Sequence, residues 1–430
     1  MVPVLKTPGA SDTGEGTVRL SCSSDSRLAE AIGLATAIDL DIVHSDTVRL
    51  STMRPSTLIG SGKVEEIAGL LITLDAGLVV VDHPLTPVQQ RNLEKAWKTK
   101  VIDRTGLILE IFGRRASTRE GVLQVELAHL NYQKGRLVRS WTHLERQRGG
   151  AGFLGGPGET QIEADRRILQ EKIVRLERDL EQVRRTRHLH RSKRKKVPYP
   201  VVALVGYTNA GKSTLFNAMT GADVVAEDML FATLDPTLRR MTLPHGRTVI
   251  LSDTVGFISD LPTHLVAAFR ATLEEVLEAD LILHVRDMSD PDNHAHCADV
   301  ERILDELGVN NAGSGVVDII EVWNKIDLLP EETVTALRTQ SDANERVAPV
   351  SAVTGTGMTA FLTMIEESLS GESTVTSIHL QPDEMADVAW LYDHSRVLSR
   401  SDGDDGSVVL NVEITEHDVS QFERRRRKAV

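Results

Sequence analysis

The sequence predicts an α/β protein built around a P-loop domain. A small parallel α/β domain with a long helical (coiled-coil) hairpin precedes it, and a small α+β domain follows. Three observations support this fold class. Strand-like apolar runs alternate with helical patterns over 18–117 and again over 198–372. Apolar residues repeat at heptad spacing on both sides of a glycine-rich segment. The segment Gly206–Ser213 matches G-x-x-x-x-G-K-[ST] directly after an apolar run.

The composition bounds the class of protein. The 430 residues are 41% hydrophobic and 26% charged, which is ordinary for a chain of several globular domains. The two cysteines, Cys22 and Cys297, indicate a reducing compartment. No apolar run approaches the ~20 residues that cross a bilayer, and the first residues lack a secretory pattern. We expect a cytoplasmic protein without a membrane span, and disorder over residues 1–17, which are rich in Gly, Ser, Thr and Pro.

The N-terminal domain, residues 18–117, reads as alternating helices and strands. Helical patterns cover 29–38, 62–74 and 86–98, and strand patterns cover 47–50, 78–82 and 100–103. Strands separated by helices pair in parallel. This region is therefore expected to form a small parallel sheet covered by helices.

Residues 118–197 are expected to form an antiparallel coiled-coil hairpin. Its two seams, with 4-3 spacing and one interrupting lysine, consist of Leu123, Leu127, Leu130, Lys134, Leu137, Trp141 and Leu144, and of Leu169, Ile173, Leu176, Leu180 and Val183. The joining segment 148–158 has six glycines in eleven residues and cannot remain helical. Thr160, followed by Glu163, is the expected cap of the second helix. Each helix of ~28 residues would extend ~42 Å.

Charge is unevenly distributed along the chain. The net charge is −13, yet residues 104–200 hold 22 Lys/Arg against 11 Asp/Glu. An acidic body with one basic limb can direct that limb at a polyanion, and basic clustering is typical of nucleic-acid binding. The alternative is that long solvated helices simply collect arginine.

The P-loop predicts a phosphate site. Its glycines let successive backbone N–H groups surround the α- and β-phosphates, Lys212 reaches the β- and γ-oxygens, and the Ser213 hydroxyl ligates Mg²⁺. The phosphate-binding residues are expected to be Gly206, Tyr207, Thr208, Asn209, Ala210, Gly211, Lys212 and Ser213.

Three further motifs identify the nucleotide as guanine. A carboxylate such as Asp327 can accept two N–H bonds from guanine, whereas adenine would leave it unpaired. Asp253 can hold the Mg²⁺ shell, and the Gly256 N–H can sense the γ-phosphate. Ser351-Ala352 fits the loop that backs the base. The residues assigned to GTP on these strand ends are Asp253, Thr254, Val255, Gly256, Asn324, Lys325, Ile326, Asp327, Ser351 and Ala352.

A switch segment lies between the P-loop and Asp253. It is expected to contact GTP through Phe231, Ala232, Thr233, Leu234 and Asp235. Thr233 is the expected second Mg²⁺ ligand, with Thr237 as the other candidate. Phe257 stands where many GTPases have a water-orienting Gln, and an apolar side chain cannot orient water. No catalytic residue is therefore assigned, and slow intrinsic turnover is expected.

Several other patterns have ordinary structural interpretations. Gly60-Ser-Gly62-Lys63 lacks the P-loop spacing and is expected to be a helix start. His294, His296 and Cys297 lack a second ligand pair for zinc. Residues 402–406 are expected to be a hairpin turn rather than a calcium loop. The α+β domain, 373–430, ends in a basic run that either touches RNA or solvates a helix end.

Taken together, G-Y-T-N-A-G-K-S, F-A-T-L-D-P-T, D-T-V-G-F-I and N-K-I-D, with the upstream G-F-L-G-G-P-G-E-T-Q, resemble the HflX family of ribosome-associated GTPases. The likeness runs from about 60 to 370. It implies a P-loop GTPase that binds the large ribosomal subunit near the peptidyl-transferase centre and splits stalled or idle ribosomes under heat or antibiotic stress. The hairpin tip that would enter the ribosome is Gly152, Phe153, Leu154, Gly155, Gly156, Pro157 and Gly158. Arg286 departs from the pattern, since a small apolar residue is expected there.

Two other functions remain open at this point. One is a ribosome-assembly GTPase that binds the large subunit and its rRNA without splitting ribosomes. The other is a signalling switch that uses the hairpin to bind proteins. In each case the expected ligands are GTP or GDP with Mg²⁺, and a monomer is expected.

Overall fold

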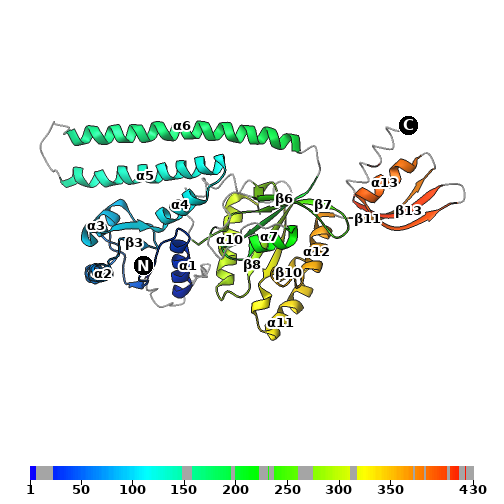
Figure 1. Cartoon of the computed structure of the whole chain (residues 1–430), viewed down its shortest axis with the longest axis horizontal. Coiled ribbons are helices and arrows are strands. Elements are labelled where there is room, and N and C mark those ends of the chain that lie inside the picture. Colours follow the sequence, from blue (N-terminus) through cyan, green and yellow to red (C-terminus); the bar gives the residue numbers. More distant parts are fainter. Residues whose placement is uncertain are drawn as a thin grey trace, which may run out of the picture.

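The computed structural model describes residues 1–5, 23–147, 157–194, 199–221, 231, 237–259, 275–309, 317–370, 373–381, 384–403, 407–415 and 422. The chain forms three bodies and a hairpin (Figure 1). The N-terminal domain and the central P-loop domain lie side by side, the helical hairpin lies along the N-terminal domain, and the C-terminal domain follows the end of the P-loop domain. No helix in these ranges combines the length and hydrophobicity needed to cross a membrane.

The N-terminal domain is a parallel α/β unit, as the alternating pattern predicts. Its strands form two parallel pairs, β1 with β2 and β3 with β4. The Met1 amino group donates to Val80 O at 3.0 Å and the Asp82 N–H donates to Met1 O at 2.9 Å, so β1 also adjoins β3. The elements are β1 (Val2–Leu5), α1 (Ser24–Thr36), β2 (Thr47–Leu50), α2 (Ser61–Thr73), β3 (Leu78–Val81), α3 (Pro87–Trp97), β4 (Lys100–Asp103) and α4 (Arg104–Arg115).

The prediction that residues 1–17 are disordered is wrong for the first five residues. Val2–Leu5 form a strand in full register with β2, and Val2 is completely buried. A short apolar strand at a sheet position gains both ladder hydrogen bonds and burial, and these outweigh the polar composition of the residues that follow it. Residues 6–17 lie outside the described residues.

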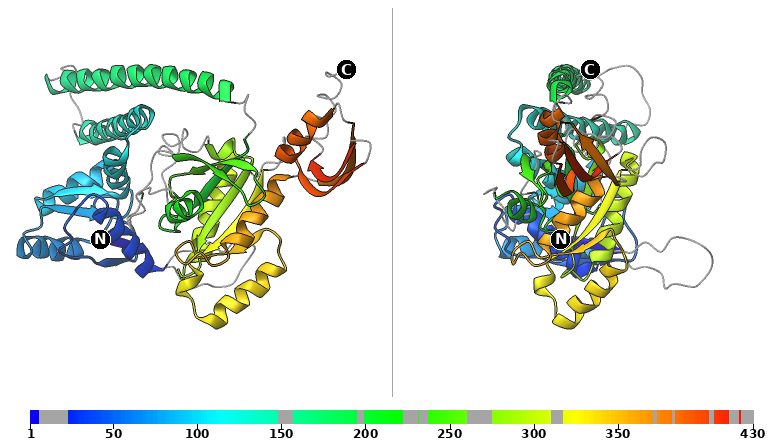
Figure 2. Two further views of the ribbon diagram at one scale, coloured as in Figure 1. Left: turned by 45° about the vertical axis from the view of Figure 1, so that its right-hand side comes forward. Right: turned by 90° about the vertical axis from the view of Figure 1, so that its right-hand side faces the viewer.

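The helical hairpin consists of α5 (Arg119–Gln147) and α6 (Pro157–Arg194). Its predicted seam is confirmed where side chains are described, because Leu130, Ile173 and Leu176 form a buried cluster against Leu123, Leu127 and Leu169. Helix α5 packs on α3 and α4, and α6 lies on its outer side (Figure 1). The Gln147 and Pro157 ends lie at the end of the hairpin farthest from the P-loop domain (Figures 1 and 2).

The second helix of the hairpin begins four residues earlier than a cap at Thr160 would place it. It starts at Pro157, so Pro157 and Gly158 belong to α6 rather than to the tip, and Thr160 is not a cap. Proline at the first helical position has a preset φ and no N–H to leave unpaired, which makes it a better start than an interior threonine. Residues 148–156 lie outside the described residues.

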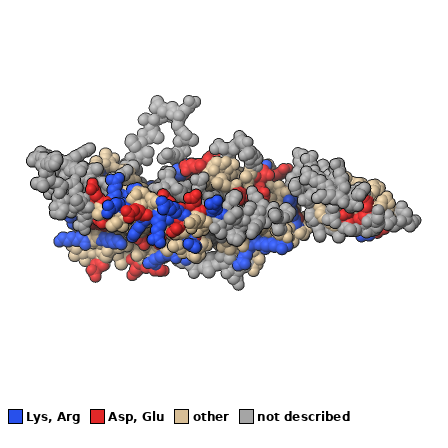
Figure 3. Space-filling view, turned by 90° about the horizontal axis from the view of Figure 1, so that it is seen from above, with Lys and Arg blue, Asp and Glu red and all other residues tan. Residues whose placement is uncertain are grey.

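The charge of the hairpin is mixed along its described face. Viewed from above, Lys/Arg and Asp/Glu side chains intersperse along this face (Figure 3). In the sequence, residues 163–185 hold seven basic and six acidic residues, whereas 186–196 hold six basic and no acidic residues. The basic excess of the limb is therefore concentrated at the end of α6 that leads into the P-loop domain.

The central domain is a six-stranded sheet in the order β10-β9-β8-β5-β7-β6, parallel except for β6. Central strands such as β5 and β8 are buried on both faces, as their uninterrupted apolar runs predict. The elements are β5 (Val201–Gly206), α7 (Lys212–Thr220), β6 (Thr237–Thr242), β7 (Thr248–Asp253), β8 (Leu281–Asp287), α10 (Asn293–Leu307), β9 (Asp318–Asn324), η1 (Ile326–Leu328), α11 (Glu331–Asp342), β10 (Val347–Pro349) and α12 (Met358–Ser370).

The C-terminal domain is a three-stranded antiparallel sheet in the order β11-β13-β12 with one described helix. Its elements are β11 (Ser373–Leu380), α13 (Met385–His394), β12 (Arg396–Asp402) and β13 (Val408–Thr415). Gly403 N–H donates to Ser407 O at 2.8 Å and closes the hairpin, which confirms the predicted turn. The rest of the expected final helix lies outside the described residues, apart from Phe422.

The N-terminal and P-loop domains share one hydrophobic core. A single buried cluster includes Leu34 of α1 and Phe112 of α4 together with Val205 of β5 and Phe257 beyond β7. Phe112 meets Phe231 edge to face, with ring centroids 4.7 Å apart. Because the two domains bury apolar surface against each other, their contact is part of the fold.

Candidate nucleotide site

The P-loop joins the end of β5 to the start of α7 at the carboxyl edge of the sheet. Two of its glycines are required by close approach and by backbone conformation. A Cβ on Gly206, at φ +153°, would lie 2.2 Å from Val285 O of the neighbouring strand. A Cβ on Gly211, at φ +89°, would lie 2.3 Å from Asn324 Nδ2. The absence of a side chain at Gly206 and Gly211 therefore lets the β8 backbone and the Asn324 side chain, at the end of β9, pack against the loop.

Lys212 is the charged group at the centre of the site. It is buried, and its Nζ donates to Tyr207 O at 2.7 Å and to Gly206 O at 3.2 Å. Burial lowers the pKa of Lys212 to about 8, although Asp253 opposes this shift. An anion brought to Nζ would favour the charged ammonium, so the site is suited to binding phosphate.

Ser213 and Asp253 are positioned together, as a shared magnesium shell requires. The Ser213 hydroxyl donates to Asp253 Oδ2 at 2.8 Å, and Asp253 is completely buried at the end of β7. Mg²⁺ prefers such hard oxygen ligands, and it keeps several waters that a nearby carboxylate can hold. The two side chains fit the ion: the Ser213 hydroxyl would ligate it, and Asp253 would hold its waters.

Asn324 ties three of the predicted motifs together. Its Nδ2 donates to Ala210 O of the P-loop at 2.9 Å, and its Oδ1 accepts from Ala352 N–H at 3.2 Å. Lys325, in the left-handed region at φ +63°, makes an ion pair with Asp287 at 2.7 Å. The contacts made by Asn324 fix the distance between the phosphate loop and the turns predicted to hold the base.

The predicted base-recognition residues lie on those turns. Asp327 is exposed on η1, where its carboxylate is accessible to a ligand. Ser351 is completely buried, and its hydroxyl oxygen accepts from Thr354 N–H at 3.1 Å, which shapes the turn that presents Ala352. An exposed acceptor beside a rigid turn can pair with the N–H groups of a guanine edge.

The segment after β7 lies against the P-loop. Phe257 N–H donates to Gly206 O at 3.1 Å, and Phe257 O accepts from Thr208 N–H at 2.8 Å. The Phe257 side chain is 2% exposed in the core shared with the N-terminal domain. It therefore points away from any attacking water, as an apolar residue at that position implies.

Part of the predicted site is not described by the structure. Ala232, Thr233, Leu234 and Asp235 lie outside the described residues, as do residues 152–156 of the hairpin tip. Phe231 is buried against Phe112 in the interdomain core. Thr237 begins β6 and pairs with Asp253 in the sheet register. The Mg²⁺ role of Thr233 stays a prediction.

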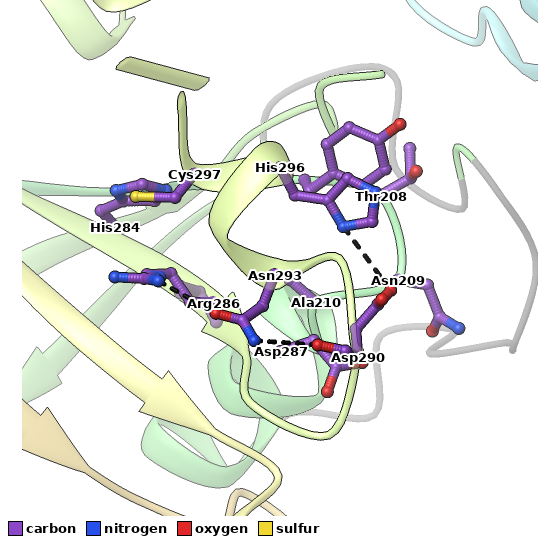
Figure 4. Close-up of a pocket in the computed structure, with 12 residues that line it drawn as sticks. Thr208, Asn209, Ala210, His284, Arg286, Asp287, Asp290, Asn293, His296 and Cys297 are labelled. Carbon is purple, nitrogen blue, oxygen red and sulfur yellow. Dashed lines mark hydrogen bonds and ion pairs between the residues drawn. The ribbon is translucent and has the colours of Figure 1, made fainter. Parts of the chain in front are cut away.

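Beside the P-loop, β8 and α10 enclose a small cavity of about 60 Å³ (Figure 4). His296 stacks on Tyr207 with ring centroids 3.8 Å apart and pairs with Asp290 at 3.5 Å. Cys297 is buried beside the cavity, where burial raises the pKa of its thiol to about 12. His296 thus packs against the P-loop, Cys297 lies buried on the same helix, and His294 is exposed.

Two sequence features that raised questions have clear structural roles. Arg286 makes an ion pair with Glu321 on β9 at 2.6 Å and donates to Asn293 Oδ1 at 3.1 Å, so its charge is accommodated at the sheet edge. Gly60 is the N-cap residue of α2, and Lys63 pairs with Asp46 at 3.0 Å, which confirms the predicted helix start.

Sequence reasoning missed the polar contacts that join the site to the N-terminal domain. Tyr207 OH donates to Glu30 Oε1 at 2.7 Å, and Arg104 Nη2 donates to Ser259 O at 2.9 Å. A signal was available, because Asp103-Arg104 interrupts two apolar runs that must both be buried. Charges in such a position need partners.

A P-loop after β5, a carboxylate at the end of β7 and an Asn-Lys-x-Asp turn after β9, all on one sheet edge, define a P-loop GTPase. Family models match nearly the whole chain: "GTP-binding GTPase N-terminal" at 25–113, "GTP-binding GTPase Middle Region" at 115–194, "50S ribosome-binding GTPase" at 201–325 and "HflX C-terminal domain" at 336–429. The chain belongs to the HflX family of GTPases.

Relatives match over almost their full length. The GTPase HflX of Magnetococcus marinus is 48% identical over 89% of this chain and 87% of its own. That of Escherichia coli K12 is 44% identical over 90% of this chain and 89% of its own. A solved GDP complex of a GTP-binding protein from Sulfolobus solfataricus is 22% identical over 80% of this chain and 96% of its own, with a TM-score of 0.44. That structural likeness is too distant to carry an argument about the site.

Proposed function

We propose that this protein binds the large ribosomal subunit through the far end of its hairpin and uses GTP to split stalled or idle ribosomes under stress. The observation that carries the proposal is the combination of a GTPase site with a hairpin whose joining segment, residues 148–156, is rich in glycine. We propose further that it acts in the cytoplasm as a monomer and that hydrolysis requires Mg²⁺, held through Ser213 and Asp253 with Thr233.

The hairpin is suited to reaching into RNA. At 1.5 Å per residue, the 38 residues of α6 extend about 57 Å. Glycines let backbone pass where side chains cannot, and Phe153 and Leu154 offer an apolar surface that can contact an unpaired base. The basic run at 186–196 would bind phosphates near the base of the hairpin, which favours attachment along its length.

The buried Phe257 supports activation by the partner. It leaves the position of a water-orienting residue without a polar group, so part of the catalytic constellation has to come from elsewhere. We propose that the large subunit supplies or orders it. Slow turnover by the free protein and strong stimulation by large subunits are expected in single-turnover assays.

A sucrose-gradient profile tests splitting directly. Intact ribosomes incubated with the protein and a non-hydrolysable GTP analogue should shift from monosomes to subunits. An assembly GTPase would co-sediment with large subunits and leave monosomes intact, and that outcome would replace the splitting function. A protein-binding switch would show no association with ribosomes at all.

A tip variant tests the role of the hairpin. Replacing residues 152–156 with a serine linker should spare GTP binding, because the P-loop begins about 50 residues later on another domain. Splitting should be lost, while salt-sensitive attachment to large subunits partly persists. Undiminished splitting would show that the tip merely closes the hairpin.

A further inference from the structure

Asp103 and Arg104, at the start of α4, contact the N-terminal domain, the P-loop domain and the hairpin. Arg104 is 2% exposed, and its guanidinium contacts Asp82 at 2.5 Å and Glu30 at 3.1 Å, both in the N-terminal domain. Its Nη2 also donates to Ser259 O at 2.9 Å, in the segment that follows Phe257. A buried guanidinium presents donors in a fixed fork, so these contacts hold Ser259 at a set distance from α4.

The same segment is held a second time through Tyr207 of the P-loop. Tyr207 OH donates to Glu30 at 2.7 Å, accepts from Ser259 N–H at 3.0 Å and lies 2.7 Å from Ser259 Oγ. Ser259 Oγ also donates to Asp299 of α10 at 3.0 Å. The Tyr207 ring is kept in place by its stacking on His296. Glu30 therefore bonds both groups that position Ser259, namely Tyr207 and Arg104.

The neighbouring residue, Asp103, faces the hairpin instead. It accepts from Tyr132 OH at 2.5 Å and from Arg136 Nη2 at 2.6 Å, both on α5, and it accepts from Gly106 N–H at 2.8 Å to cap α4. Tyr132 is thus a second tyrosine whose hydroxyl bonds a carboxylate at the start of α4, but it is only partly buried and lies on the hairpin.

The position in which Ser259 is held matters for the γ-phosphate. Gly256 lies so close to the P-loop that a Cβ there would be 3.1 Å from Lys212 Nζ and 2.9 Å from Thr208 Cγ2. Lys212 Nζ meanwhile donates to P-loop carbonyls. A γ-phosphate oxygen that accepted from both Nζ and the Gly256 N–H would need space between them, and this close packing leaves little. GDP places no such group there.

We propose that Arg104, Glu30 and Tyr207 act as positioning residues that hold Ser259, and with it the Gly256–Phe257 segment, in the arrangement that disfavours the γ-phosphate. The N-terminal domain thereby sets the preference of the site between GDP and GTP.

The test compares two Tyr→Phe variants of the full-length protein. Dissociation constants for GDP and for a non-hydrolysable GTP analogue are measured with Mg²⁺ by fluorescence of labelled nucleotides. Y207F removes the bonds to Glu30 and Ser259 but keeps the ring stacked on His296. We expect it to lower the ratio Kd(GTP analogue)/Kd(GDP) about three- to tenfold, the effect of losing one or two hydrogen bonds in one of two states. S259A should lower the ratio in the same direction.

Y132F is the matched control, because it removes a partly buried tyrosine hydroxyl from a carboxylate at the start of α4. Its ratio should equal that of the unmodified protein. If Y132F shifts the ratio as much as Y207F, the effect is general loosening of α4 and the proposal is overturned. It is also overturned if Y207F changes both dissociation constants by the same factor, or changes neither.

Two further variants identify the link itself. E30Q in the Y207F background should shift the ratio by less than the two single changes add up to, because both changes remove the bond between Tyr207 and Glu30. Full additivity would show that Glu30 and Tyr207 act independently and would contradict the proposal. R104K keeps the charge between Asp82 and Glu30 but cannot reproduce the fork to Ser259, so it should lower the ratio in protein that remains folded. An unchanged ratio in a folded R104K protein would exclude Arg104 as a positioning residue.

Discussion

Two helices of this protein follow a parallel strand, and their first turns are used in opposite ways. Helix α7 follows β5 through a glycine-rich loop, whose N–H groups and Lys212 could bind an anionic ligand. Helix α4 follows β4 without a loop, and its first turn is filled by Asp103 of the same chain, which accepts from Gly106 N–H. Both ends carry the positive pole of a helix. The start of α7, called the open end below, leaves room for an anion. The start of α4, called the sealed end below, is occupied by the Asp103 carboxylate.

The difference shows what makes a helix start a binding site. At α4 the carboxylate is held by Leu85 N–H at 3.0 Å, Tyr132 and Arg136, and a Cβ on Gly106 would lie 3.2 Å from it. No space remains for a ligand. At α7 the loop contributes five residues between strand and helix, so the backbone can surround a group that the chain does not supply. The two helix starts have the same polarity, and they differ in the number of residues between the strand and the helix.

The largest expected effect comes from removing the charge at the open end. K212A should reduce single-turnover GTP hydrolysis by about 10³-fold, because a preorganised cation facing developing phosphate charge contributes on this scale. Phosphate release from pre-bound nucleotide measures the rate. K63A is the matched control, since Lys63 also follows Gly-Ser-Gly but pairs with Asp46 and Glu66 on a helix start. A hydrolysis rate in K212A near that of K63A would rule out the P-loop assignment.

The next effect concerns the base that the open end selects. D327N should weaken GTP binding by about 100-fold and improve binding of the xanthosine nucleotide, because an amide can donate to the xanthine carbonyl where a carboxylate cannot. Competition binding with both nucleotides measures the preference. Unchanged preference for GTP would mean that a residue other than Asp327 reads the base.

The open end was predictable from sequence because its chemistry demands fixed residue types at fixed spacing. Gly206, Gly211 and Lys212 are required by close approach and by charge, and each motif follows a strand that its apolar run identifies. The heptad seam of the hairpin was predictable for a similar reason, since its period fixes which residues meet.

The start of α4 and the polar contacts between the two domains were not predictable in the same way, because their partners are distant in the chain. Arg104 meets Ser259 across 155 positions, and Tyr207 meets Glu30 across 177. Nothing in local spacing pairs them. The strand Val2–Leu5 was missed because its stability comes from neighbours in the sheet rather than from its own composition.

Neutralising the internal anion should destabilise the sealed end. In D103N, an NH₂ group would face the N–H donors of Leu85, Gly106 or Arg136 or the O–H donor of Tyr132, so we expect a loss of about 3–4 kcal/mol in the opening free energy of α4. Hydrogen exchange of α4 amides measures it. D39N makes the same change in an exposed pair with Arg114 and should cost less than about 0.5 kcal/mol. Equal losses in the two variants would show that Asp103 does not hold the helix start.

The smallest expected effect separates the two regions by pH. His284 lies on β8 beneath the open end, where burial lowers its pKa to about 4, with Arg286 and Lys212 acting in the same direction and Glu321 opposing. The unfolded chain, with a His pKa near 6.5, binds more protons than the folded protein between these values. Stability of the central sheet should therefore fall as pH falls, by about 2 kcal/mol from pH 6.5 to 4.5 on account of this residue.

Hydrogen exchange of β8 amides at both pH values measures this loss of stability. H284Q cannot titrate at this position, so its loss of stability should be smaller by about 2 kcal/mol. The Asp103–Arg104 contacts use no histidine, so H284Q should leave the pH dependence of α4 exchange unchanged. If H284Q and the unmodified protein lose stability equally at β8, His284 is not held neutral by burial, and acid acts on the central sheet through its carboxylates instead.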